Sequence, residues 1–446
     1  MSAIDPAWLD ELSDWLRIPS ISADPAHADD VRAAGEWVCA FVRAAGGDCE
    51  LVDFDGRPLA LGELRASTDS DTAATVLVYG HFDVQPPAPL DRWESPPFEP
   101  TIRDEWLYAR GVADDKGQLY LLLKAATMLA AAGALPVNVR IASDGEEEIG
   151  GHTIVDWLAQ DERGADAAVI FDAHMPRRGQ PAFYIATRGL CYFHVKVTTG
   201  ARDLHSGTFG GAALSATHVL MRTLAGVLAG PDGRLPEPLR KGVIPPTEHE
   251  LADWSSQRPG VDVLSEQGAR PMDDHAAEEF YVRTWGEPSL DVNGVEGGSP
   301  HLQKTVVPVS AEANLSIRLA AGQKVEEVAP EVERLLWEAA PAGADVEVDL
   351  LASTRPGLVS PDSQAIGLGQ DAFERVLGAR PLLLRSGGSI PIVPALADRG
   401  VPTIMTGFDL PEGNLHSPNE RLLVEHLPLG VSAAQELFGE LAGLRR

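Results

Sequence analysis

Residues 75–83 read TVLVYGHFD, and the fold can be worked out from this stretch. Its first five residues are apolar or β-branched without alternation, which is typical of a strand buried on both faces. Residues 137–142 and 167–171 are predicted to form further buried strands, and a helix is predicted over 117–131. Strands that alternate with helices predict an α/β domain whose mostly parallel central sheet is flanked by helices.

Polar side chains follow each of these predicted strands. His81 follows the first strand, the acidic run Glu146–Glu148 follows the second, and Asp172 follows the third. Ligands of open parallel sheets bind at the carboxyl ends of the strands, so these side chains are expected to share one site. A glycine-containing loop adds Asp114, and the stretch NLHS adds His416.

The resulting donor set contains carboxylate oxygen and imidazole nitrogen but no thiolate. Such a set predicts a catalytic site for Zn²⁺, with Mn²⁺ or Co²⁺ as substitutes. Two metals about 3.5–4 Å apart need a bridging ligand and terminal ligands on each side. Asp114 is the predicted bridge. His81 and Asp172 are predicted to complete the site of one metal. Glu148 and His416 are predicted to complete the other.

Neighbouring acids are given supporting roles. Asp83 lies two residues after His81 and can accept a hydrogen bond from its non-ligating ring nitrogen. Glu147 precedes Glu148 and points elsewhere, as a general base beside a metal-bridging water should. Asp115 either supports the ligands or starts the following helix, and the residues leave both interpretations open.

Length and composition bound the class of protein. A chain of 446 residues is expected to hold two or more domains. The net charge of −30 argues against nucleic acid and anionic membranes as partners. The three cysteines form no CxxC motif, which predicts neither a disulfide framework nor a cysteine zinc site. We find no signal peptide and no apolar run of about 20 residues, so a cytoplasmic location is expected.

The pattern of elements changes near Arg188. Alternating strands are predicted over 191–198, 310–319 and 345–351, with helices over 212–228 and 325–339, and they indicate an inserted α+β domain with an antiparallel sheet. The α/β pattern returns after Pro356, with a helix over 363–377, a strand over 401–406 and a last helix from about 428. We therefore predict a catalytic domain in two parts, 1–187 and 354–446, around an inserted lid and dimerisation domain, 188–353. Residues 230–290 receive no assignment.

Four motifs together carry a resemblance to a known family. They are GHFDVQP at 80–86, RGVADDKG at 110–117, EEEIG at 146–150 and NLHS at 414–417. In this order they resemble the co-catalytic metallopeptidases that include carnosinase-type dipeptidases, succinyl-diaminopimelate desuccinylase and glutamate carboxypeptidase. The resemblance covers essentially the whole chain and implies two metal ions per chain. It implies the ligands His81, Asp114, Glu148, Asp172 and His416, with Glu147 as the base.

Motifs in the predicted inserted domain resemble the carnosinase-like branch. The stretch DLHSGTFGG implies that His205 polarises the scissile carbonyl in the site of a partner subunit, and hence a homodimer formed through this domain. KTVVP and SIRL imply substrate-binding roles for Thr305 and Arg318. RSGGSIP implies that Gly388 and Ser389 hold the substrate's C-terminal carboxylate.

Three departures from the animal relatives concern the preferred side chains of the substrate. Ser386 stands where those relatives carry an acid, and Ala173-His174 replaces a polar and aromatic context. After the predicted strand that ends near Leu351, no histidine corresponds to a further substrate-contacting histidine of those relatives.

These features lead to one functional hypothesis with rivals. We expect a two-metal hydrolase that cleaves small peptides, most simply dipeptides with a free C-terminal carboxylate, through a water activated by Glu147. An N-acyl-amino-acid deacylase is the first alternative, and a carboxypeptidase acting on longer peptides is the second. A non-catalytic binding protein of the same fold is disfavoured, because Glu147 and all five implied ligands are present.

Overall fold

The computed structural model describes residues 5–54, 56–388 and 390–444, and within them the chain forms two compact units. Unit 1 contains the residues up to Ile185, Val359–Leu384 and the residues from Ile390 onward. Unit 2 contains Ala186–Leu358 and a short segment that begins at Arg385. Each unit has its own hydrophobic core. A chain of this length is expected to form more than one core, because single hydrophobic cores stop growing at shorter chain lengths.

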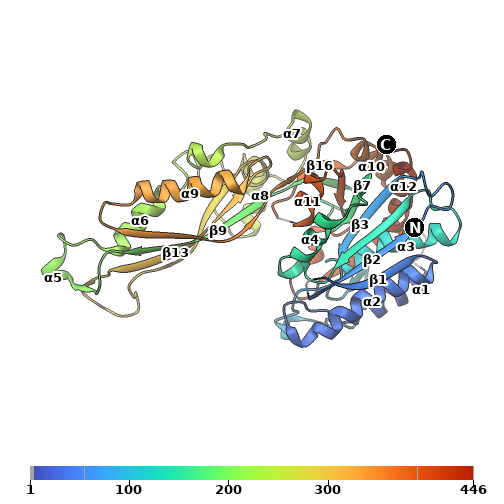
Figure 1. Cartoon of the computed structure of the whole chain (residues 1–446), viewed down its shortest axis with the longest axis horizontal. Helices are drawn as coiled ribbons and strands as arrows, with labels where there is room; N and C mark the ends of the chain where they lie inside the picture. The colour runs from blue at the N-terminus through green and yellow to red at the C-terminus, as the bar shows by residue number, and fades with distance from the viewer. Residues whose placement is uncertain (1–4, 55, 389, 445–446) are drawn as a thin grey trace. The chain divides into compact units, whose positions relative to one another are not determined.

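The elements of unit 1 are shown in Figure 1. Its helices are α1 (Pro6–Leu16), η1 (Pro25–His27), α2 (Ala28–Ala44), η2 (Leu90–Arg92), α3 (Lys116–Ala131), η3 (Glu147–Ile149), α4 (His152–Gln160), α10 (Gln364–Leu377), α11 (Ile392–Asp398), η6 (Pro411–Gly413) and α12 (His426–Leu441). Its strands are β1 (Asp48–Phe54), β2 (Arg57–Leu64), β3 (Thr75–His81), β4 (Thr101–Arg103), β5 (Trp106–Tyr108), β6 (Asn138–Asp144), β7 (Ala167–Phe171), β17 (Thr403–Thr406) and β18 (Arg421–Leu423). Strands β8 (Ala182–Thr187) and β16 (Leu382–Arg385) include points at which the chain passes between the units.

The central sheet of unit 1 has the strand order β1-β2-β6-β3-β7-β17 among the described residues. The pairs β6–β3, β3–β7 and β7–β17 are parallel, whereas β1–β2 and β2–β6 are antiparallel. Figure 1 shows α4 and α11 on one side of this sheet and α3, α10 and α12 on the other. Strand β3 is buried almost throughout, because helices cover both faces. The predicted fold class is confirmed.

Local sequence explains where the helices begin and end. The Asp5 carboxylate accepts a hydrogen bond from the Ala7 amide at 3.0 Å, and Pro6 occupies the first position of α1. Ser363 caps α10 in the same way through the Ile366 amide. Helix α10 ends at Leu377 and is capped by Gly378, whose φ of 73° is the left-handed conformation that favours glycine.

Unit 2 is built on an antiparallel sheet with the order β11-β13-β9-β14. Its strands are β9 (Gly189–Thr198), β10 (Leu204–His205), β11 (Ser289–Glu296), β12 (Val306–Val307), β13 (Ser310–Leu319), β14 (Asp345–Thr354) and β15 (Gly357–Leu358). Its helices are α5 (Ser206–Phe209), α6 (Ala216–Ala225), η4 (Glu237–Arg240), α7 (Glu248–Ser255), α8 (Gly260–Glu266), the π-helix η5 (Val282–Gly286) and α9 (Val325–Ala339). Alternate residues of β9 and β13 are buried, as the period of two predicts.

Several elements differ from the sequence expectations. The hairpin β1–β2 was not predicted, because its strands mix apolar, charged and glycine residues at the edge of the sheet. The helix predicted over 212–228 is confined to α6, which is capped at Gly226. The unassigned stretch 230–290 contains α7 and α8.

The limits of the units lie close to the predicted domain limits. The chain enters unit 2 after Ile185 and leaves it after Leu358, against expected changes at 187/188 and 353/354. Strand β14 continues to Thr354, which carries unit 2 further along the chain. Arg385 also belongs to unit 2, where its guanidinium binds the buried carboxylate of Glu250 at 2.7 Å.

Candidate metal centre

Three neighbouring parallel strands position three of the five candidate ligands. His81 is the last residue of β3, Asp172 directly follows β7, and Glu148 lies in the short helix η3 after β6. Parallel strands in register bring their carboxyl ends to one edge of a sheet, and His81 is aligned with Asp144 of β6. The edge therefore collects an imidazole and several carboxylates from segments far apart in the sequence.

Asp114 lies between the two predicted histidine ligands. Its Oδ1 is 3.0 Å from Nε2 of His81, and its Oδ2 is 2.9 Å from Nε2 of His416. The same nitrogen of His416 is 3.2 Å from Oε2 of Glu148. Two groups of side chains result, His81–Asp114–Asp172 and Asp114–Glu148–His416, and each offers ligand atoms within 4.8 Å of one another.

The arrangement fits a pair of divalent cations. Each group offers three protein donors of oxygen and nitrogen type, the number that catalytic zinc sites use. The Oε1 atom of Glu148 is buried without a hydrogen-bond partner, and a cation would satisfy it. Burial, followed by the charge of Asp114, raises the pKa of Asp172 well above its usual range. A cation would relieve this repulsion between carboxylates.

Burial and neighbouring charges shift the pKa values of the acids in the centre. Burial alone would raise the pKa of Asp114, but hydrogen bonds from His416 and His81 lower it below its usual value. Burial, together with the charges of Asp114 and Glu148, raises the pKa of Glu147 to about 7. A carboxylate with a pKa near neutrality can both accept and release a proton at physiological pH.

Asp83 connects the strand end to the acidic turn. Its carboxylate accepts hydrogen bonds from the amides of Glu147 at 3.2 Å and Glu148 at 3.1 Å. Oδ1 of Asp83 also lies 3.3 Å from Nδ1 of His81, and its main-chain oxygen lies 3.1 Å from the same nitrogen. Asp83 can therefore orient the imidazole and hold η3 in place at the same time.

Asp115 combines the two interpretations that the sequence left open. It directly precedes α3, and its Oδ2 accepts a hydrogen bond from the His81 amide at 3.1 Å. Close packing here explains a glycine of the first motif, because a Cβ on Gly80 would lie 2.5 Å from the same oxygen.

Two polar residues that contact the centre were not assigned roles from the sequence. Glu420 is fully buried and accepts hydrogen bonds from Arg110 Nη1 at 2.6 Å and from the amides of Gly111, Ala113 and Asp114. It thereby fixes the loop that presents Asp114. Gln85 donates from Nε2 to Glu148 Oε2 at 2.8 Å. Gln85 stands inside the first motif and Glu420 shortly after NLHS, which is the signal that could have indicated them.

The predicted residues of the inserted domain lie in unit 2. His205 and Thr305 are adjacent, because β10 pairs with β12 and the Ser206 amide donates to the Thr305 carbonyl at 3.0 Å. His205 is exposed, and its Nδ1 accepts a hydrogen bond from the Gly207 amide. Arg318 lies on β13.

The glycine-rich loop is only partly described. The Gly388 carbonyl accepts a hydrogen bond from the Arg188 amide at 3.0 Å, and the Gly388 amide donates to Ser386 Oγ at 3.1 Å. Ser389, predicted to bind substrate, lies outside the described residues.

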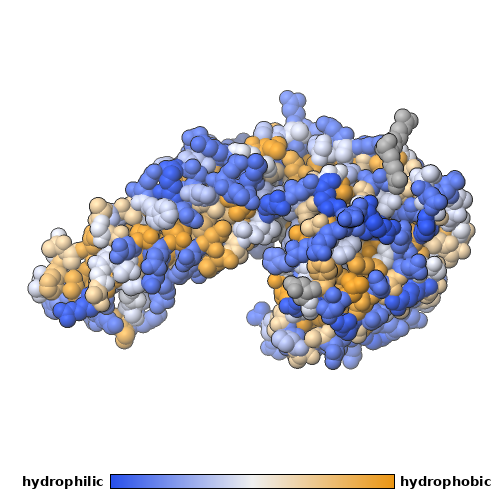
Figure 2. Space-filling view, in the orientation of Figure 1, coloured by the Kyte–Doolittle hydropathy of each residue, from blue (hydrophilic) through white to orange (hydrophobic). Residues whose placement is uncertain are grey.

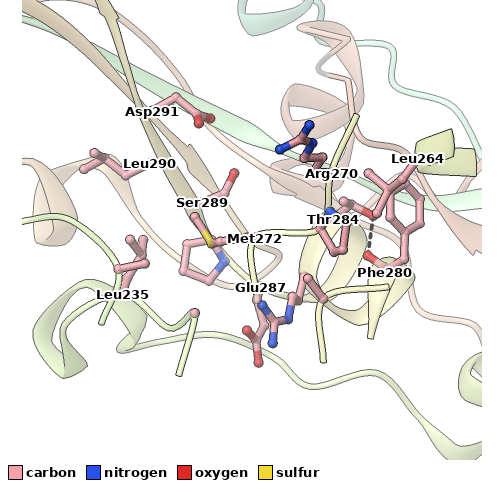
Figure 3. A pocket seen from close by; sticks show the side chains of 16 residues that line it. Leu235, Leu264, Arg270, Met272, Phe280, Thr284, Glu287, Ser289, Leu290 and Asp291 are labelled. Atoms are coloured by element: carbon pink, nitrogen blue, oxygen red, sulfur yellow. Dashed lines mark hydrogen bonds between the residues drawn. The ribbon is translucent and has the colours of Figure 1, made fainter. Parts of the chain in front are cut away.

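A separate hollow of about 380 Å³ lies in unit 2. Figure 3 shows its apolar wall, formed by side chains such as Leu235, Phe280 and Leu290, with Arg270 and Asp291 among the polar groups. Its lining comes from residues 229–291 and includes none of the described residues that the sequence predicted for the site.

Two donor groups joined by one carboxylate at the edge of an α/β sheet form an arrangement that two-metal hydrolases use. Within that class, the chain belongs to Peptidase family M20/M25/M40, whose family model matches residues 77–440. The expected family is therefore confirmed. In the described part of the chain, no helix has both the length and the apolar character that a membrane crossing requires.

Three similar proteins extend over nearly the whole chain. The Cys-Gly metallodipeptidase of Schizosaccharomyces pombe is 28% identical over 468 residues, covering 97% of this chain and 95% of that protein. The cysteinylglycine-S-conjugate dipeptidase of Corynebacterium striatum is 28% identical over 446 residues, covering 96% and 95%. The crystal structure of human carnosine dipeptidase 1 has a TM-score of 0.75 and 26% identity, covering 98% and 96%.

Proposed function

We propose that this chain is a metal-dependent dipeptidase that cleaves dipeptides with a free C-terminal carboxylate. The observation that carries the proposal is Asp114, which contacts His81 through one oxygen and His416 through the other. Full-length similarity to three dipeptidases supports the substrate class. Their shared activity favours a dipeptidase over an N-acyl-amino-acid deacylase.

The metal ligands follow from the two donor groups. His81, Asp114 and Asp172 would hold one ion, and Asp114 would be shared with a second ion. Glu148 and His416 would complete the second site. We propose zinc, with manganese or cobalt as substitutes, because the donors are oxygen and nitrogen. Bound in pairs, such cations polarise the scissile carbonyl and lower the pKa of the attacking water.

Glu147 is proposed as the general base. Its carboxylate is close enough to Asp114 and Glu148 for their charges to raise its pKa, and it makes none of the contacts that define the two donor groups. Glu147 would accept a proton from the attacking water and deliver it to the nitrogen of the leaving amine. Asp83 would keep Glu147 in position through the amide hydrogen bond at the start of η3.

Residues of unit 2 are proposed to bind the substrate. Arg318 would pair with the C-terminal carboxylate through a charge-assisted hydrogen bond, assisted by Thr305 and by Gly388 and Ser389. His205 would donate a hydrogen bond to the oxyanion that forms at the scissile carbonyl. These assignments rest on the motifs of the inserted domain.

We further propose a homodimer formed through unit 2, in which His205 serves the partner's site. Exposed apolar side chains support this surface, among them Phe209 on α5 and Met221 on α6, which are 45% and 61% exposed. Figure 2 shows apolar surface over this part of unit 2. Exposed apolar residues that cluster on a surface are typical of sites of association.

A substrate panel tests the proposed activity. Free dipeptides, the same dipeptides with an amidated C-terminus, N-acetyl and N-succinyl amino acids, and longer peptides would be compared with Zn²⁺ or Mn²⁺ present. We expect free dipeptides to have the highest kcat/KM and amidation to remove most of it. A higher kcat/KM on N-succinyl amino acids would instead favour the deacylase, and equal rates on amidated dipeptides would contradict the carboxylate contact.

A further inference from the structure

Two cysteines of unit 1 lie against each other. Both precede the predicted metal ligands in the sequence. Cys39 belongs to α2 and Cys49 to β1, and their Sγ atoms are 2.9 Å apart. Both side chains are buried, with 0% and 8% of their surface exposed. The third cysteine, Cys191, is buried in β9 of unit 2. The proposed peptidase mechanism uses none of the three.

The surrounding elements hold the two sulfur atoms in this position. Helix α2 packs on β1 and β2, and a turn at residues 45–47 joins the helix to β1. Cys49 is paired with Gly62 of β2, where an added Cβ would lie 2.9 Å from the Cys49 sulfur. A disulfide bond is about 2.0 Å long, so forming one requires the sulfur atoms to approach by about 1 Å.

A surface hollow gives small molecules access to the pair. The hollow has a volume of about 600 Å³, and Cys49 lies in its wall together with Arg43 and Arg163. Arg43 donates from Nε to the Cys49 carbonyl at 2.7 Å, which places its positive charge beside the thiols. Nearby cations favour the thiolate form, which is the reactive one.

The hydrogen bond between the two thiols shifts their pKa values in opposite directions. The thiol of Cys49 donates a hydrogen bond to the Cys39 sulfur, and this bond lowers the pKa of Cys39. The same hydrogen bond raises the pKa of Cys49. Loss of one proton from the pair therefore leaves a thiolate that the remaining thiol stabilises.

We propose that Cys39 and Cys49 form a reversible intrachain disulfide that joins α2 to β1, and that peroxide and small thiols reach it through the hollow at Cys49. This inference is independent of the proposed peptidase activity.

The chemistry requires one molecule of peroxide for each disulfide. The pair loses one proton, the remaining proton passes along the hydrogen bond from Cys49 to the Cys39 sulfur, and the Cys49 thiolate attacks peroxide, which forms an S–O bond, breaks the O–O bond and releases hydroxide. The Cys39 sulfur attacks the Cys49 sulfur, which forms the S–S bond and expels a second hydroxide. The two protons of the thiols and the two hydroxides give two waters. A small thiol reverses the modification by thiol–disulfide exchange and is itself oxidised.

The test uses the whole folded protein. Reduced protein is treated with hydrogen peroxide, alkylated under denaturing conditions and digested with trypsin. Because Arg43 lies between the two cysteines, trypsin separates Cys39 from Cys49 unless a disulfide joins the peptides. We expect a linked pair of peptides, loss of two of the three alkylatable thiols, and recovery of both after treatment with dithiothreitol. The midpoint of thermal unfolding is expected to rise on oxidation.

Matched variants separate the disulfide from general oxidation. Cys191→Ser should behave as the wild type, whereas Cys39→Ala and Cys49→Ala should give neither the linked peptides nor the rise in unfolding temperature. Three alkylatable thiols after peroxide treatment would overturn the proposal. So would oxidation of Cys49 to sulfinic acid in the wild type without a link to Cys39, or a disulfide between two chains.

Discussion

Asp114 has a different neighbour at each of its carboxylate oxygens. One oxygen faces His81 from the sheet edge, and the other faces His416 from a loop more than 300 residues later in the chain. A carboxylate with both oxygens directed at separate donor groups can bridge two cations. The bridging role predicted from the sequence is thus compatible with the geometry of the side chain.

Replacing neighbouring glutamates should separate the base from a ligand. Glu147→Gln is expected to lower kcat by about 10²–10⁴-fold with normal metal content, since it removes only proton transfer. Glu148→Gln should lower both kcat and metal content. Steady-state kinetics and metal analysis of the two variants would check this, with thermal unfolding as the control for folding. Near-normal turnover of Glu147→Gln would show that another acid is the base.

A buried acid near the centre should make stability depend on pH. Asp409 is 1% exposed, and burial raises its pKa to about 8. Between about pH 4 and pH 8 the folded state therefore holds a proton that the unfolded state has lost. The free energy of unfolding of the metal-free protein should fall as pH rises through this range, by up to about 1.4 kcal/mol per pH unit from this group.

Asp409→Asn tests that account by urea unfolding at several pH values. The variant should lose less stability than the wild type between pH 5 and pH 8. Asp91→Asn, at an exposed acid of η2, is the control and should follow the wild type. Parallel pH profiles of the wild type and Asp409→Asn would show that Asp409 does not titrate in this range.

At the residue scale, the predicted site rests on motifs more than on isolated residues. His81, Asp114 and Glu148 stand in short patterns whose spacing and position after strands indicate metal binding. Glu420 is a single acid in a loop, and its contact with Arg110 across 310 residues cannot be inferred from local sequence. The contact between the thiols of Cys39 and Cys49 could not be predicted either, because the two cysteines form no recognisable motif.

In the loop from Arg110 to Asp114, the amides of Gly111, Ala113 and Asp114 all donate hydrogen bonds to the Glu420 carboxylate. Glu420→Gln would replace one of the accepting oxygens by an NH2 group, which would face main-chain N–H donors. The substitution would also leave the buried Arg110 without its counter-charge. We expect a loss of about 3–5 kcal/mol in the free energy of unfolding, together with weaker metal binding. Denaturant unfolding and metal titration would measure both.

An exposed acid in the same region provides a matched control. Glu412→Gln on η6 should change neither quantity by much, because Glu412 is exposed. If Glu420→Gln binds metal and unfolds as Glu412→Gln does, then Glu420 does not hold the loop.

At the scale of elements, the strands that could be predicted from the sequence are those that are buried on both faces. Strands β3, β6 and β7 are buried almost throughout, and they could be predicted because both faces are covered. Strand β1 lies at the sheet edge and β2 is its neighbour, and both have mixed burial, so their pattern is weak.

At the scale of the whole molecule, each unit contains part of the proposed machinery. The five candidate ligands and Glu147 lie in unit 1, whereas His205, Thr305 and Arg318 lie in unit 2. The segment from Arg385 joins unit 2 through Glu250, a long-range ion pair that local patterns do not reveal.

Hybrid dimers test whether His205 acts across subunits. His205→Ala and Glu147→Ala homodimers should each be nearly inactive. Mixing them with subunit exchange should restore about a quarter of the wild-type activity, because about half of the dimers are hybrid and each has one intact site of two. Subunit exchange would be verified by mass spectrometry. No recovery after verified exchange would place His205 in its own chain's site or outside catalysis.

The central claim is that hydrolysis depends on two ions held around Asp114. The most direct measurement is to titrate chelator-treated, metal-free protein with Zn²⁺ while following hydrolysis of a free dipeptide. The account predicts negligible activity at the start and a rise that saturates at about two ions per chain. Asp114→Asn should fail to recover under the same titration. Full activity of the metal-free wild type would contradict the account.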